Sequence, residues 1–65
     1  MHVYEKVRTF IVENDYDPAM IAAKANMSTD TLRAIISGKR TMYADDLRAI
    51  CLALNVSPER FIEIK

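Results

Sequence analysis

Apolar residues recur at helical spacing along most of the chain, and this spacing is the strongest constraint on its fold. Val3, Val7, Phe10 and Ile11 follow the i, i+4, i+7, i+8 pattern that places side chains on one face of a helix. Strand signals are poor, because the 65 residues include a single glycine and no Asn-Gly or Asp-Gly hairpin turn. The pattern therefore predicts an all-α fold.

Capping residues and prolines divide the apolar pattern into five predicted helices. Asp17-Pro18 and Ser57-Pro58 each place a capping side chain before a proline, which suits the first helical position because its missing N–H costs nothing there. Ser28 is the candidate N-cap of the third segment. The predicted helices cover residues 3–13, 18–25, 29–36, 44–54 and 58–63.

Two residues are predicted to adopt the left-handed backbone conformation between these helices. Asn26 lies in the turn after the second segment, and asparagine tolerates this conformation better than most residues. Gly38 follows the third segment, where a left-handed glycine commonly ends a helix. Asn55 is expected to end the fourth segment.

The length of the chain predicts one domain over residues 1–65, with no room for a second. A chain of this size buries only about 60% of its unfolded surface, so each apolar position matters for stability. Cys51 is the one cysteine, which excludes an internal disulfide and suits a reducing compartment. No apolar run approaches the roughly 20 residues of a membrane span, and the start of the chain lacks the layout of a signal peptide. We therefore expect a cytoplasmic protein.

Positive charge is concentrated in the middle of the chain, although nine basic residues balance nine acidic ones overall. Residues 1–17 carry a net charge of −2 and residues 44–65 a net charge of −1. Residues 18–43 set four basic residues against one acidic residue, a net charge of +3. The basic residues of this middle segment are Lys24, Arg33, Lys39 and Arg40. A local excess of this kind is what electrostatic steering of a nucleic acid requires.

The second and third predicted helices have the lengths and the short connection of a helix-turn-helix. In that motif the second helix enters the DNA major groove, and its N-terminal residues touch base edges. Leu32 and Ile35 are placed to anchor residues 29–36 from below. Outward positions on the same helix are then left to Thr29, Asp30 and Arg33.

Residues 17–57 resemble the phage-repressor-like helix-turn-helix family, which is also called the Xre or lambda-repressor-like family. The stretch "IAAKANMSTDTLRAIISGKR" matches the family signature without a gap, with Ile21-Ala22 as the apolar-Ala pair and Asn26 at the turn. The later stretch "LRAICLALNVSPERF" matches the family's fourth helix and the Val-Ser pair that begins the segment after it. The resemblance implies a compact five-helix domain. It also implies a sequence-specific DNA-binding transcriptional regulator from a phage, prophage or bacterium.

Residue roles follow from the resemblance position by position. The residues implied to contact base edges of a double-stranded DNA operator are Thr29, Asp30 and Arg33. An arginine can contact guanine with two hydrogen bonds, which discriminate against other bases by about 1–3 kcal/mol. The residues implied to lie along the DNA backbone are Ser37, Lys39, Arg40, Thr41 and Tyr43. One such domain makes few contacts, so a homodimer on a two-fold site is a further expectation.

The sequence departs from the family at four positions and thereby supports an alternative function. Pro18, Ile36 and Met42 stand where the family commonly has glutamine, glutamate and proline, and Asn26 replaces the usual turn glycine. Extra apolar surface would suit a protein-binding helix-turn-helix module, such as a phage antirepressor or modulator that docks on a repressor protein. The anchors predicted for that partner are Met20, Ile36 and Met42, and the residues predicted for a dimer contact are Phe61, Ile62 and Ile64.

The sequence gives no support for catalysis, a metal or a cofactor. It has no glycine-rich phosphate loop and no nucleophile with a neighbouring base. His2 is an isolated imidazole without Cys, His or carboxylate neighbours at ligand spacing. A domain of this size is also expected to offer little concave volume for a small-molecule substrate. We therefore predict that the chain is not an enzyme.

Overall fold

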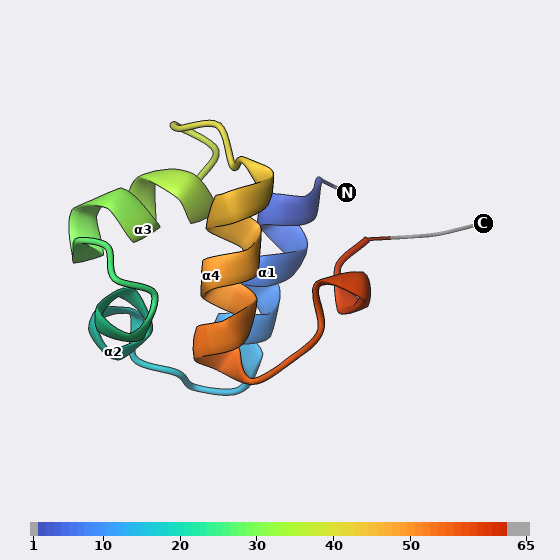
Figure 1. Ribbon diagram of the computed structural model, residues 1–65, viewed down its shortest axis with the longest axis horizontal. Helices are drawn as coiled ribbons and strands as arrows, with labels where there is room; N and C mark the ends of the chain where they lie inside the picture. The colour runs from blue at the N-terminus through green and yellow to red at the C-terminus, as the bar shows by residue number, and fades with distance from the viewer. Residues whose placement is uncertain (1, 63–65) are drawn as a thin grey trace.

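The computed structural model describes residues 2–62, which form four α-helices followed by one 3-10 turn (Figure 1). The elements are α1 (Val3–Glu13), α2 (Pro18–Lys24), α3 (Thr29–Ile36), α4 (Ala44–Leu54) and η1 (Pro58–Arg60). The all-α prediction is confirmed, and the bounds of three helices agree with those predicted. The second helix is one residue shorter than predicted, because Ala25 is its C-cap.

The fifth predicted helix, over residues 58–63, is not formed as an α-helix. Only Pro58–Arg60 is helical, and it is a 3-10 turn in which the Phe61 N–H donates to the Pro58 carbonyl at 3.0 Å. Phe61 then packs into the core, with its ring 5.6 Å from that of Phe10 in an edge-on arrangement. The anchoring of this ring fixes the chain direction after one turn. Residue 63 lies outside the described residues.

Side-chain caps begin α2, α3 and η1 where the sequence predicts them. The Asp17 carboxylate accepts a hydrogen bond from the Ala19 N–H at 3.0 Å. Ser28 Oγ accepts from the Thr31 N–H at 3.1 Å, which satisfies one of the donors that a helix leaves open at its start. Ser57 Oγ accepts from the Glu59 N–H at 3.4 Å.

The turns that join the helices use left-handed residues. Asn26 has a φ of 60° and Gly38 a φ of 85°, as the sequence predicts. Asn55 ends α4 with a φ of 60°, and Asp15 adopts a φ of 55° in the connection after α1. These positions allow short connections, so that consecutive helices turn sharply against one another.

The core receives side chains from every helix. Its most deeply buried residues are Val7, Ile21, Leu32, Ile35, Ile50 and Cys51. Helix α2 packs against both α3 and α4, while α1 packs against α3 and η1 against α4. In Figure 1, α2 and α3 lie on one side of α4 and η1 lies on the other. This arrangement supports α3 from two helices and leaves its remaining face toward solvent.

Candidate nucleic-acid interface

Helix α3 divides sharply into a buried face and an exposed face. Leu32 and Ile35 are completely buried, whereas Asp30 and Arg33 are exposed. Thr29, at the first helical position, is half-buried. Thr29 and Asp30 therefore lie in the first turn of the helix and Arg33 just past its middle, and none of the three is turned into the core.

The connection between α2 and α3 has the short geometry of a helix-turn-helix. The Met27 N–H donates to the Ala22 carbonyl at 2.9 Å, which closes the turn around the left-handed Asn26. Ala22 and Ala25 are buried, so their small side chains allow the two helices to pack closely. Ser28 then begins α3 directly after the turn. The motif predicted from the sequence is present.

Four predicted DNA-contact residues share one open depression beside α3. It has a volume of about 280 Å³ and is lined by Asp30, Arg33, Ala34, Ser37 and Lys39. Asp30, Arg33 and Ser37 follow one another at helical spacing, so the helix itself brings them together. The Ser37 hydroxyl donates to the Ala34 carbonyl at 3.1 Å. A phosphate contact by Ser37 would have to replace that bond.

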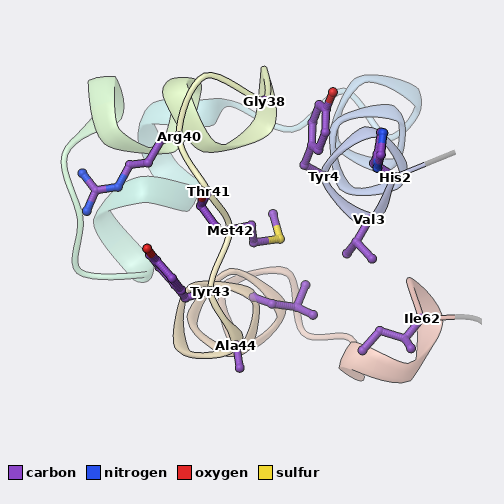
Figure 2. A pocket seen from close by; sticks show the side chains of 11 residues that line it. His2, Val3, Tyr4, Gly38, Arg40, Thr41, Met42, Tyr43, Ala44 and Ile62 are labelled. Atoms are coloured by element: carbon purple, nitrogen blue, oxygen red, sulfur yellow. The ribbon is translucent and has the colours of Figure 1, made fainter.

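The loop from α3 to α4 presents its side chains in two directions. Figure 2 shows Arg40 and Tyr43 extending on one side of the loop and Met42 extending on the other. Arg40 and Tyr43 are exposed, whereas Met42 packs against the core. The Arg40 N–H donates to the Ala34 carbonyl at 3.1 Å and ties the loop back onto α3. The basic loop thus leaves α3 in a defined direction.

An apolar groove of about 450 Å³ lies beneath this loop, contrary to the expectation of little concave volume. Its walls come from the start of α1, the loop and the start of α4 (Figure 2). The groove-lining residues include Val3, Tyr4, Met42, Leu47 and Ile62. It contains part of the predicted interface and residues of α1 that the sequence did not indicate.

One residue predicted to anchor a protein partner, Ile36, and one predicted for a dimer contact, Phe61, are buried instead. Ile36 is 8% exposed and Phe61 is 3% exposed, so neither is available as a surface anchor. Ile36 is covered because α3 packs against α1 as well as α2, a contact that helical spacing alone does not show. Met20 and Ile62 remain exposed, at 43% and 42%. Ile64 lies outside the described residues.

Sequence reasoning missed two α1 residues that hold the end of α3. Arg8 Nη1 donates to the Ile36 carbonyl at 3.3 Å, and the Arg8 guanidinium lies 5.9 Å from the centre of the Tyr4 ring. Tyr4 also lies directly against Gly38. Arg8 and Ile36 are 28 residues apart in the sequence, and Tyr4 and Gly38 lie even further apart. No local pattern could have paired them.

Metal binding and membrane crossing find no support in the described part of the chain. Within residues 2–62, no cluster of three His, Cys, Asp or Glu side chains could hold a metal ion. None of the described helices has the length and apolar character needed to cross a bilayer.

A hydrogen bond from the His2 N–H at 3.0 Å lowers the pKa of Glu5, which lies in the first turn of α1.

Comparison with known proteins identifies the chain by its family. A family model described as the Cro/C1-type HTH DNA-binding domain matches residues 6–65. No curated protein and no solved structure matches the chain. The matched family is a DNA-binding family without enzymatic activity. The match begins within α1, covers α2, α3 and α4 in full, and agrees with the helix-turn-helix geometry of α2 and α3. The chain therefore belongs to the Cro/C1-type helix-turn-helix DNA-binding family, which is the Xre or lambda-repressor-like family.

Proposed function

We propose that this chain is a sequence-specific transcriptional regulator, of the kind found in phages, prophages and bacteria, that reads the major groove with α3. The division of α3 into a buried Leu32/Ile35 face and an exposed Asp30/Arg33 face carries this proposal. A recognition helix needs one face fixed to the domain and the other turned to the DNA. Helix α3 has one buried face and one exposed face within its eight residues, and this division supports the proposed role.

Base recognition is assigned to Thr29, Asp30 and Arg33. Arg33 has five N–H donors and can contact guanine O6 and N7 together. Thr29 can hydrogen-bond to a base edge or contact a thymine methyl group. Asp30 can accept a hydrogen bond from cytosine N4, although its charge also repels nearby phosphates.

Phosphate contact is assigned to the exposed loop after α3. Lys39 and Arg40 supply positive charge, while Thr41 and Tyr43 supply hydroxyl donors. Such contacts release counterions and make affinity fall with salt, by a slope of about 0.9 per phosphate contact. Ser37 is a weaker candidate because its hydroxyl already donates to Ala34. The +3 charge of residues 18–43 suits this part of the chain for DNA.

Homodimer formation on a two-fold operator is part of the proposal. A single module of this kind covers few base pairs, so two copies are needed for affinity at physiological salt. The exposed Ile62 is a candidate for the contact between copies.

Selection of binding sites from random duplex DNA tests the proposal. The selected duplex should bind more tightly than random DNA, with an affinity that falls steeply as salt rises. Arg33→Ala should weaken binding to it by about 5- to 150-fold, which corresponds to the loss of one bidentate contact. Arg60→Ala is the matched control, since it removes the same charge from η1, on the other side of α4 from α3 (Figure 1). Failure to enrich any sequence, or equal losses in both variants, would contradict the proposal.

The alternative of a partner-binding module has less support, because Ile36, one of its predicted anchors, is not exposed. Ile36 is buried, and Met42 packs against the core rather than standing out from the surface. Among the three predicted anchors, only Met20 remains exposed. The exposed face of α3 is instead polar and carries Asp30 and Arg33.

A further inference from the structure

The C-terminal end of α3 has all four of its terminal carbonyl groups satisfied. An α-helix leaves its last four carbonyls without partners inside the helix, so each needs a donor from elsewhere. The loop supplies three of these donors through its own backbone. The carbonyl oxygens of Arg33, Ala34 and Ile35 accept from the N–H groups of Ser37, Arg40 and Gly38 respectively, at 3.0, 3.1 and 3.2 Å.

The fourth carbonyl depends on a side chain from another helix. Ile36 O accepts from Arg8 Nη1 at 3.3 Å, and Arg8 projects from α1. A positive charge at this place also suits the negative end of the α3 dipole. The Arg8 guanidinium lies 5.9 Å from the centre of the Tyr4 ring, within the range of a cation–π contact. Arg8 therefore connects α1 to the last residue of α3.

Tyr4 makes the second connection, to the first part of the loop. A Cβ atom added to Gly38 would lie 2.6 Å from Tyr4 Cζ and 2.7 Å from the Tyr4 hydroxyl oxygen, so the ring lies directly against the glycine backbone. Figure 2 shows the Tyr4 ring beside the loop at Gly38, with His2 next to it. The His2 and Tyr4 rings stack with centres 5.5 Å apart. The ring limits where the backbone can run just before Lys39 and Arg40.

From these contacts we infer that Tyr4 and Arg8 are positioning residues for DNA binding. Together they fix the end of α3 and the start of the loop, so that Lys39 and Arg40 are held ready for phosphates. The inference rests on the proposed role of this loop at the DNA backbone. Tyr4 and Arg8 then act on DNA binding through the loop and not by contacting DNA themselves. By holding the loop in place, they reduce the ordering that the loop must undergo on binding.

Charge-neutral substitutions of Tyr4 give the sharpest test. Tyr4→Ala removes the ring, whereas the matched control Tyr4→Phe keeps the ring against Gly38 and loses only the hydroxyl. Both variants should be checked for folding by circular dichroism and compared at a temperature where each is fully folded. Backbone 15N order parameters at residues 38–41 should fall in Tyr4→Ala, to below about 0.6, and remain high in Tyr4→Phe.

Binding to a random-sequence duplex then measures the functional consequence without knowledge of an operator. The salt slope should become shallower in Tyr4→Ala by about one to two units, since each lost phosphate contact removes about 0.9. Replacing Lys39 and Arg40 together by glutamine should then weaken binding less in Tyr4→Ala than in the unaltered chain. Arg8→Lys provides a second variant with unchanged charge. Lysine lacks the planar guanidinium that reaches Ile36 and the Tyr4 face together. The salt slope of DNA binding by Arg8→Lys should therefore also become shallower.

The outcomes separate the inference from the proposed function. Order parameters and salt slopes in Tyr4→Ala that equal those in Tyr4→Phe would overturn the positioning role. Absence of salt-dependent DNA binding by the unaltered chain would instead overturn the proposed function, and with it the phosphate part of this inference. The order parameters would still decide whether α1 orders the loop.

Discussion

Leu32 and Arg33 are adjacent in α3, yet Leu32 is 0% exposed and Arg33 points into solvent. Leu32 packs into a core cluster that draws residues from every helix. Arg33 lines the open depression shared with Asp30 and Lys39. A core residue and the residue proposed to read DNA are thus neighbours in one short helix, which allows the two roles to be separated by substitution.

Leu32→Ala should destabilise the fold by about 2–5 kcal/mol, because it removes buried methyl groups and leaves a cavity. Arg33→Ala should change the free energy of unfolding by no more than about 0.5 kcal/mol, as exposed positions usually do. Urea denaturation followed by circular dichroism measures both values. A larger loss of stability in Arg33→Ala than in Leu32→Ala would contradict the assigned orientation of α3.

Ser28→Ala should destabilise the fold by about 1 kcal/mol, because Ser28 Oγ accepts from the Thr31 N–H at 3.1 Å. Ser28→Asp keeps an acceptor at the N-cap and serves as the control, with stability close to that of the unaltered chain. Thermal unfolding of the three proteins provides the comparison. Equal melting temperatures for Ser28→Ala and Ser28→Asp would show that the cap has no role in holding α3.

Asn26→Ala should destabilise the fold by about 1–2 kcal/mol, because Asn26 has a φ of 60° and alanine resists this conformation. Asn26→Gly should retain or increase stability, since glycine adopts positive φ without a steric cost. Denaturant midpoints of the two variants test the turn directly. Greater stability of the alanine variant would mean that the turn between α2 and α3 adopts a different backbone conformation.

Burial of Cys51 raises the pKa of its thiol above the ordinary value. The thiol therefore ionises in the unfolded chain at a lower pH than in the folded chain, and the folded state binds more protons between the two pKa values. The contribution of Cys51 to stability should be complete below about pH 8.5 and should be lost as the pH rises further, toward the folded pKa.

Cys51→Ala isolates this effect from other alkaline titrations. The difference in unfolding free energy between the unaltered chain and Cys51→Ala should stay constant from pH 6 to about pH 8. Above that pH, the unaltered chain should lose stability relative to Cys51→Ala. A difference that stays constant to pH 10 would contradict a buried thiol with a raised pKa.

Local signals predicted most of the fold because the helix ends are encoded locally. Asp17 and Ser28 each cap a helix within a few residues, and Gly38 ends α3 through its own backbone conformation. The exposed face of α3 was equally predictable, since one turn of apolar spacing fixes which side Leu32 and Ile35 occupy. These features do not depend on residues far along the chain.

Features that depend on packing between distant helices could not be predicted. Helical spacing within α3 alone places Ile36 at the surface, whereas the contact between α1 and α3 buries it. Arg8 reaches Ile36 across 28 positions of sequence. The last turn stops at Arg60 because Phe61 packs against Phe10 from α1.

The central claim is that Arg33 reads a guanine in the major groove, and a 7-deazaguanine substitution tests it most directly. Each guanine of the selected duplex is replaced in turn, which removes the N7 acceptor from the major-groove edge. At one position the unaltered chain should lose affinity, by up to about 10-fold, while Arg33→Ala should show no further loss from its weaker starting value. Equal sensitivity of both proteins at every guanine, or no sensitivity in either, would contradict the account.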